Sequence, residues 1–387
     1  MTPEQQTEQQ PQPSAGRESA AWRPNRREII RAGGIGAAAI VGAGLAAGPA
    51  QGQSRRAGTE TTPTETTPTE TELITRTIPG SQQRLPAIGL GTFMTFDSLP
   101  GRGRDTHAEI VRTFWQAGGR VFDSSPVYGA AEANLGRAAA ELRINDRMFV
   151  ADKIWSTGDY LWDVQHAEYS LSRSMRRLSR RAPLDVVHCH SLVNVDVVVP
   201  LLHALKKEGR IRRLGISHHD PSYFPQLASW LERGALDVVQ VHYSIHTRAA
   251  EERILPAAQE RGVAVLVNMP LEKARLHRVV AGRPVPDFAR EAGMHTWAEY
   301  FLKWVIAHPA VTCALPATSN PAHLAENVAA MRGQLPDPDM RERMRRHLET
   351  FPGFDQIGTM PWYPEKNYPG LVSRAQEALR RRSPWWP

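Results

Sequence analysis

The chain has 387 residues, a formal net charge of +7 and 41% hydrophobic residues. This length suits one large domain with appendages, and a mild basic excess without a nucleic-acid-binding motif argues against a nucleic-acid partner. Cys189 and Cys313 are too few for a disulfide framework, and without a C-x-x-C motif they do not suggest a zinc site. We expect both thiols to be free and buried.

The first fifty residues have the composition of an export signal. The pair Arg26-Arg27 precedes a Gly/Ala-rich run over 32–47, and small residues ending at Ala50 follow. The run is shorter than the ~20 apolar residues that cross a bilayer. We predict a twin-arginine signal over 1–50 that the twin-arginine translocation machinery recognises. The mature protein would be periplasmic or extracellular without a stable membrane span, and a retained N-terminal anchor is the alternative.

The next segment separates this signal from the folded part. Residues 59–72 repeat the unit TETTP and have no apolar side chain to bury, which predicts a disordered Thr/Glu/Pro linker over 51–72. The pattern Gly34-x-Gly36-x-x-Ala39 fits a dinucleotide-binding motif. We discount it because no strand precedes it and no acid follows at the required strand end.

From Leu73 onward, short apolar runs alternate with amphipathic stretches. A hairpin is predicted over 73–85, with its turn in PGSQQ. Strands are predicted over 86–92, 120–124, 148–154, 184–190, 212–218, 236–243, 263–268 and 311–317, and helices over 105–117, 130–142, 160–180, 197–208, 221–233, 250–261, 297–307 and 321–331. Eight such units predict an α/β fold, a closed (β/α)8 TIM barrel over 73–335 with a C-terminal extension over 336–387. An open doubly wound sheet is the alternative.

Polar residues stand at the carboxyl ends of six predicted strands. They are Asp123, Lys153, His190, Ser217, Gln240 or His242, and Asn268. In a barrel these strand ends meet at one mouth, where active sites lie. We therefore expect the functional site at this mouth.

Four residues near this mouth suit proton transfer to a carbonyl oxygen. A free tyrosine such as Tyr128 has a pKa near 10, and we expect the ammonium of Lys153 to lower it. A carboxylate at Asp123 would keep the lysine charged, and His190 would orient a carbonyl. This set favours a general acid that protonates an alkoxide as hydride arrives from a cofactor.

Several motifs resemble those of the aldo-keto reductase family. LPAIGLGTF at 85–93 resembles the first strand of that family, and FDSSPVYGAAEANLG matches its Asp…Tyr-Gly…Glu…Leu-Gly signature. ADKIW supplies the third-strand lysine, LDVVHCH has the spacing that selects His190 over His188, and GRIRRLGIS and ALPATSNPAHLAEN match later motifs. The resemblance covers residues from about 73 to 340.

The resemblance implies an NAD(P)H-dependent oxidoreductase that transfers hydride between a nicotinamide cofactor and a carbonyl or alcohol substrate. Tyr128 would donate the proton, Asp123 and Lys153 would tune it, and His190 would position the carbonyl. The cofactor, normally NADPH, would lie extended across the mouth, with its phosphate near the N-terminus of the last helix. The implied cofactor-binding residues are Gly91, Thr92, Asp123, Ser217, His218, Gln240, Asn268, Pro270, Leu271, Ala317, Thr318, His323, Glu326 and Asn327. Among these, Ser217 and Gln240 would bond the carboxamide.

The chain departs from the family pattern at several of these positions. His218 replaces an asparagine, and Asn268 replaces an aromatic residue that stacks on the nicotinamide. Ala317 and His323 stand where a lysine and an arginine usually hold the 2′-phosphate. We therefore favour NADP(H) but leave NAD(H) open, with nearby arginines as candidate replacements for this pair.

Two further questions concern aromatic residues. The tail ending PWYPEKNYPGLVSRAQEALRRRSPWWP does not resemble the usual C-terminus of the family. Its aromatic residues and prolines either cover the mouth or pack on the outside, and we expect outside packing. Trp155 and Phe93 either line an aromatic substrate pocket or pack in the core.

Two other functions fit parts of the pattern. A metal-dependent barrel hydrolase would use His188-x-His190 with His218 and His242 as ligands, but its usual first-strand and last-strand ligands are missing. A non-catalytic nicotinamide-binding sensor would use the same barrel to recognise a partner. The complete catalytic set argues against lost chemistry, so we favour the reductase.

Overall fold

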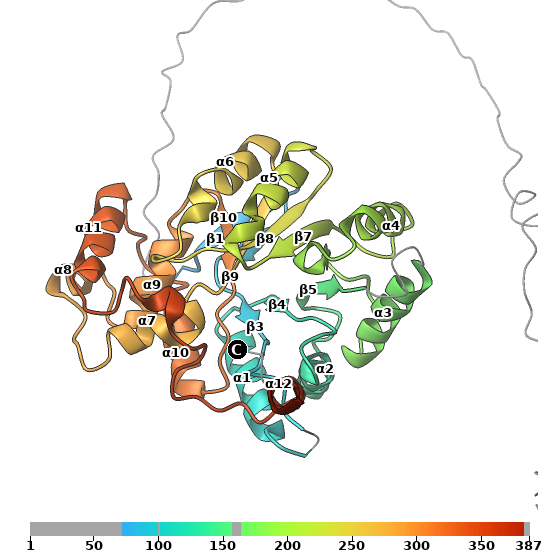
Figure 1. The fold of residues 1–387 in the computed structure, drawn as a ribbon, viewed down its shortest axis with the longest axis horizontal. Coiled ribbons are helices and arrows are strands. Elements are labelled where there is room, and N and C mark those ends of the chain that lie inside the picture. The colour runs from blue at the N-terminus through green and yellow to red at the C-terminus, as the bar shows by residue number, and fades with distance from the viewer. Residues whose placement is uncertain (1–71, 100, 157–163, 383–387) are drawn as a thin grey trace, which may run out of the picture. The chain divides into compact units, whose positions relative to one another are not determined.

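The computed structural model describes residues 72–99, 101–156 and 164–382 (Figure 1). The predicted signal, the discounted glycine pattern and the linker up to residue 71 lie outside these residues. None of the described helices has both the length and the apolar composition needed to cross a bilayer.

The described residues form the predicted barrel. An eight-stranded parallel sheet follows chain order and consists of β3 (Leu90–Gly91), β4 (Val121–Asp123), β5 (Phe149–Ile154), β6 (Val186–Cys189), β7 (Leu214–His218), β8 (Val238–His242), β9 (Ala264–Asn268) and β10 (Val311–Ala314). The first and last strands meet, because the backbone N–H of Gly89 donates to the carbonyl of Ala314 at 2.7 Å and that of Gly91 to Pro316 at 2.9 Å. The closed barrel is confirmed, and the open doubly wound sheet is wrong.

Helices alternate with these strands and surround them (Figure 1). The predicted helices correspond to α1 (Arg104–Gln116), α2 (Ala131–Glu141), α3 (Val164–Arg177), α4 (Val195–Lys207), α5 (Phe224–Glu232), α6 (Ile254–Arg261), α9 (Trp297–Ile306) and α10 (Pro321–Ala329). Local sequence sets their starts: Thr296 and Glu299 form a capping box on α9, and Asn320 caps α10. Sequence patterning missed α7 (Arg275–Val279), α8 (Asp287–Glu291), α11 (Pro338–Glu349) and α12 (Leu371–Arg382).

The predicted hairpin closes the amino-terminal end of the barrel. Strands β1 (Thr75–Thr77) and β2 (Arg84–Pro86) pair antiparallel. Ile78 and Leu85 of this hairpin pack in one apolar cluster with Val121, Phe149, Ala151, Val186, Val238, Ala264, Leu266, Cys313 and Leu315. Both cysteines are free and buried, as predicted. The hairpin therefore covers the apolar floor of the barrel.

The inward face of the strands changes from apolar to polar toward the carboxyl end. On β4, Val121 is followed two residues later by Asp123, and on β9, Leu266 is followed by Asn268. Because side chains alternate between the two faces of a strand, residues two apart point to the same side. The polar strand ends therefore gather at the mouth opposite the hairpin.

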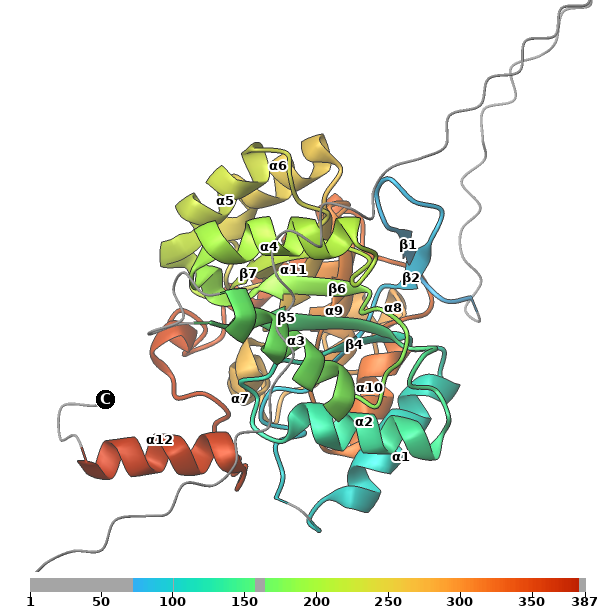
Figure 2. The same ribbon diagram turned by 90° about the vertical axis from the view of Figure 1, so that its right-hand side faces the viewer.

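The C-terminal extension crosses this mouth. The N–H of Tyr363 donates to the carbonyl of Lys273 at 3.0 Å, and the N–H of Val372 donates to Asp97 Oδ2 at 2.7 Å. Figure 2 shows α12 and the β1–β2 hairpin at opposite ends of the barrel. The expectation that the tail packs only on the outside is wrong, because these two backbone contacts tie it to loops at the mouth.

Asp97 joins this tail to the turn that contains the predicted proton donor. Its Oδ1 accepts a bond from the N–H of Ala130 at 2.9 Å. Gly129, at φ 62°, has no room for a side chain, because a Cβ there would lie 2.1 Å from Asp97 Oδ1. The glycine of the Tyr-Gly motif is therefore required by this contact.

Candidate active site

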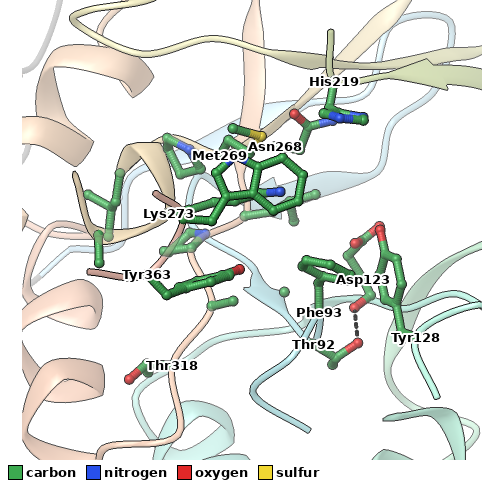
Figure 3. Close-up of a pocket in the computed structure, with 18 of the residues that line it drawn as sticks. Thr92, Phe93, Asp123, Tyr128, His219, Asn268, Met269, Lys273, Thr318 and Tyr363 are labelled. Carbon is green, nitrogen blue, oxygen red and sulfur yellow. Dashed lines mark hydrogen bonds between the residues drawn. The ribbon is translucent and has the colours of Figure 1, made fainter. Parts of the chain in front are cut away.

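A cavity of about 700 Å³ opens at the carboxyl ends of the strands (Figure 3), within the range of about 300–1,000 Å³ typical of small-molecule sites. Its walls include Gly91, Thr92, Asp123, Ser217, His218, Gln240, Asn268, Pro270, Leu271, Ala317, Thr318, His323, Glu326 and Asn327, which are all the predicted cofactor-binding residues. Tyr128 and His190 also line it. The structure thus brings the predicted residues together at one site.

A buried ion pair lies behind the cavity wall. The Nζ of Lys153 is 2.6 Å from Asp123 Oδ1, and it also donates to the carbonyl of Ser124 at 2.7 Å. Gln240 Nε2 donates to the same Asp123 oxygen at 2.7 Å. Both charged side chains are buried, so each depends on the other for compensation in a region of low dielectric.

Tyr128 is packed between this ion pair and the cavity. Its ring centroid lies 5.0 Å from Lys153 Nζ and 4.9 Å from the ring of Phe93. Burial, followed by the carboxyl groups of Asp123 and Asp152, raises the pKa of Tyr128 well above 10.0. The expectation of a lowered pKa is therefore wrong, because the burial of the phenol outweighs the nearby ammonium of Lys153. The phenol stays protonated at neutral pH.

His190 faces Tyr128 across the site. Their ring centroids are 5.7 Å apart, and His190 Nδ1 lies 3.0 Å from Ser125 Oγ. Ser125 Oγ accepts a bond from the N–H of Val127, and its hydroxyl proton can be donated to Nδ1. Burial, and then the charge of Lys153, lowers the pKa of His190 well below 6.5. A neutral ring with its proton on Nε2 can donate one hydrogen bond into the cavity.

The side chains predicted near the nicotinamide differ in whether they already have hydrogen-bond partners within the protein. Gln240 donates to Asp123, and Ser217 Oγ accepts from the N–H of Ser191 at 3.3 Å. Asn268 Oδ1 is buried and has no hydrogen-bond partner within the described part of the chain. A buried acceptor without a partner is costly, so this oxygen marks a place where a ligand N–H fits.

One carboxylate fixes the loop that follows β9. Met269, Glu272, Lys273 and Ala274 all have positive φ angles, between 50° and 70°, which side chains other than glycine rarely adopt. Glu272 accepts bonds from His242 Nε2 at 2.7 Å, Ser244 Oγ at 2.5 Å and Arg275 Nη2 at 2.6 Å. These bonds offset the cost of the strained backbone and place the loop against the cavity.

This carboxylate should make stability sensitive to acid. Burial raises the pKa of Glu272, but bonds from His242 and Ser244 outweigh it and hold the pKa at about 2, below the 4.5 of a free glutamate. Because the pKa of Glu272 is lower in the folded than in the unfolded protein, its charged carboxylate stabilises the fold above about pH 4.5. This stabilisation, about 3 kcal/mol, is lost as the pH falls from about 4.5 toward 2. Urea unfolding of Glu272→Gln should show lower stability at pH 7 and a flatter acid profile than the wild type.

The matched control for this variant is Glu252→Gln, because Glu252 is exposed. It should keep the wild-type profile. A wild-type acid profile in Glu272→Gln would contradict the role of this carboxylate.

The other end of the cavity lies at the start of α10. Thr318, which Figure 3 places far from Tyr128, precedes this helix, and His323 lies in its first turn. Ala317 offers no charge here. No arginine is among the described residues that line the cavity, whereas Lys273 and Lys366 are. The expectation that nearby arginines replace the missing pair is therefore wrong.

Sequence reasoning missed several residues of the site. Ser125, Lys273, Trp362, Tyr363 and Lys366 lie at or beside the cavity. Lys273 follows a predicted cofactor motif and is one of six lysines in the chain, which is a signal that was available. The tail residues carry no motif, so only the fold reveals them.

The geometry also answers two open questions: where Phe93 and Trp155 lie, and whether the histidines could bind a metal ion. Phe93 and Trp155 line the cavity, which is the first of the two placements expected for them. In the described ranges, no three His, Cys, Asp or Glu side chains are grouped to hold a metal ion. His188 is buried with Nδ1 3.3 Å from the carbonyl of Asp152, and His242 is bonded to Glu272. These contacts give no support to the metal-dependent hydrolase.

Known proteins similar to this chain include two enzymes from Escherichia coli (strain K12). Methylglyoxal reductase YeaE is 27% identical over 262 residues, which cover 66% of this chain and 89% of the relative. NADH-specific methylglyoxal reductase is 30% identical over 312 residues, which cover 67% of this chain and 94% of the relative.

Solved structures and a family model agree with these relatives. An aldo/keto reductase from Klebsiella pneumoniae in complex with NADP and acetate has a TM-score of 0.57 at 26% identity, covering 70% of this chain and 94% of its own. Another from Klebsiella pneumoniae in complex with NADPH has a TM-score of 0.59 at 25% identity, covering 77% and 99%. The model described as the aldo/keto reductase family matches residues 87–347. The chain therefore belongs to the aldo/keto reductase family.

Proposed function

We propose that this NAD(P)H-dependent oxidoreductase reduces a small carbonyl compound, with Tyr128 as the proton donor. The observation that carries this proposal is the placement of a protonated phenol, a neutral imidazole and a buried Lys–Asp pair around one cavity. Two relatives are named methylglyoxal reductases, which makes small aldehydes and ketones the first substrates to test.

The chain's own residues divide the work of the reaction. His190 donates a hydrogen bond to the carbonyl oxygen, and Tyr128 gives its proton to that oxygen as negative charge develops there. Lys153, held by Asp123, supports the negative phenolate that remains. The nicotinamide cofactor supplies the hydride when it is bound.

The residues of the cavity fit this cofactor. Asn268 Oδ1 is an open buried acceptor that suits the N–H groups of a carboxamide. Ser217 and Gln240 also line the cavity, as do Thr318, Glu326 and Asn327 near the start of α10, where the adenosine would lie. We propose NADP(H) as the preferred cofactor, with NAD(H) as the competing outcome.

Nucleotide content tests this function directly. Acid or heat should release a nicotinamide dinucleotide from the purified full-length protein, and NADPH titrated into the emptied protein should bind. Preference for NADH would keep the chemistry and change the cofactor. No bound nucleotide and no affinity for either would overturn the proposal, and metal analysis would follow.

Cofactor binding without turnover would instead favour a sensor. Carbonyl reduction by the wild type, measured as NADPH oxidation with methylglyoxal, separates the two. Tight NADPH binding without reduction of any small carbonyl in a panel would support the non-catalytic alternative.

We also propose that the protein is exported, on the basis of Arg26-Arg27 and the apolar run over 32–47. The twin-arginine route carries folded proteins, so the barrel would leave with its cofactor bound. Replacing both arginines by lysine should retain the protein in the cytoplasm, as measured by cell fractionation. Unchanged export would contradict the assignment.

A further inference from the structure

We propose that Lys366 of the C-terminal extension binds the adenosine 2′-phosphate of NADP(H). The extension thereby supplies the cation that Ala317 and His323 do not. This inference rests on the proposed function and goes beyond it, because Lys366 lies outside the residues 87–347 that match the family.

The backbone holds Lys366 at the cavity through a turn fixed on α7. The N–H of Tyr363 donates to the carbonyl of Lys273, just before α7, and the N–H of Lys366 donates back to the carbonyl of Tyr363, both at 3.0 Å. The residue before Lys366, Glu365, forms an ion pair with Arg278 of α7 at 2.9 Å. Residues 363–366 therefore form a turn whose position follows from the barrel.

This turn brings Lys366 to a group of basic side chains. His277 of α7 and His323 of α10 line the cavity with it. The charge of Lys366 acts on both rings and lowers the pKa of each, after the larger effect of burial. An acidic residue, Glu326, lies near this group, and its charge raises the pKa of His323. Lys366 itself has no ion-pair partner within the described ranges.

The three side chains have different roles toward a phosphate. Burial lowers the pKa of His277 to about 4 and also lowers that of His323. Both rings are therefore neutral near pH 7 and offer N–H donors. Lys366 then provides the positive charge, which suits a dianionic phosphate monoester.

The other lysine of the cavity is placed differently. Lys273 Nζ lies 2.8 Å from the ring centroid of Trp362 and 5.0 Å from that of Phe93. Burial, and then the charge of Arg275, lowers the pKa of Lys273 to about 6, so this amine is mostly uncharged near pH 7. Because Phe93 also contacts Tyr128, Lys273 belongs to the catalytic side of the cavity. Lys366 is the remaining lysine for the adenosine end.

The test compares nucleotides that differ only in the 2′-phosphate. Dissociation constants of NADPH, NADH, adenosine 2′,5′-bisphosphate and 5′-AMP are measured by calorimetry on the full-length wild type and on Lys366→Gln. The loss of one charged contact should weaken NADPH and the bisphosphate by about tenfold or more. NADH and 5′-AMP should keep their affinities. Lys207→Gln, an exposed change on α4, is the matched control and should alter none of them.

Each other outcome has a defined meaning. Equal weakening of NADPH and NADH, or no weakening of either, would overturn the assignment of Lys366. Failure of the wild type to bind any nucleotide would instead overturn the proposed function. If Lys366→Gln does not fold, Lys366→Met, which keeps the apolar stem, gives the same comparison, and Lys366→Arg should retain the preference for NADPH.

Discussion

Replacing Tyr128 by phenylalanine should lower kcat for carbonyl reduction by about 10²- to 10⁴-fold, the usual contribution of a positioned general acid. The ring packs against Phe93 and near the Lys153 ammonium, so the variant keeps its shape and loses only the hydroxyl. Dissociation constants for the cofactor should change little. Steady-state kinetics with a small aldehyde, together with a cofactor titration, measure both quantities.

The pH dependence of the wild type provides a second measurement of the same role. Burial and two nearby carboxyl groups keep the pKa of Tyr128 well above 10.0. Carbonyl reduction needs the phenol and should therefore keep its rate as the pH rises through the neutral and mildly alkaline range. Alcohol oxidation needs the phenolate as a base, so its rate should increase over that range.

Tyr169→Phe is the matched control for the phenylalanine variant, because Tyr169 is exposed on α3. It should behave as the wild type. A Tyr128→Phe enzyme with kcat within a few-fold of the wild type would require another donor, and His190 would be the first to test.

Much of this site was predictable because barrel geometry is regular. Once the alternation of strands and helices indicates parallel strands, a residue such as Asn268 is placed at the mouth by its position at a strand end. The Asp123–Lys153 contact follows from the same rule, since both residues lie near the carboxyl ends of the neighbouring strands β4 and β5. The predicted strands are longer than the observed ones, because the apolar pattern of the sequence does not indicate where the hydrogen bonds between neighbouring strands end.

The site residues and the pKa direction that sequence analysis did not predict correctly depend on features that leave no pattern in the sequence. Trp362, Tyr363 and Lys366 reach the cavity through backbone bonds to Lys273 and Asp97, and backbone bonding over such sequence distances has no periodic pattern. The predicted direction of the Tyr128 pKa shift is wrong because the sequence motifs indicate the neighbouring lysine but not how deeply the phenol is buried. Ser125 was missed because a serine in a turn is usually only a turn residue.

Replacing Lys153 by methionine should cost the fold about 3–5 kcal/mol, the usual effect of breaking a buried ion pair. Asp123 would remain buried with its charge uncompensated, although Gln240 still donates to it. Activity should also be lost, because nothing would then support the phenolate. Urea unfolding and steady-state kinetics measure the two effects. The exposed pair Lys206–Asp237 provides the control, since Lys206→Met should cost no more than about 1 kcal/mol.

The double variant Lys153→Met/Asp123→Asn separates stability from catalysis. Removing both charges should restore much of the stability lost in Lys153→Met, because no buried charge is left without a partner. Carbonyl reduction should stay lost, because Tyr128 would still lack the ammonium at 5.0 Å from its ring. If activity recovered together with stability, Lys153 would serve the fold alone. If Lys153→Met retained full stability, the ion pair would not be essential to the barrel.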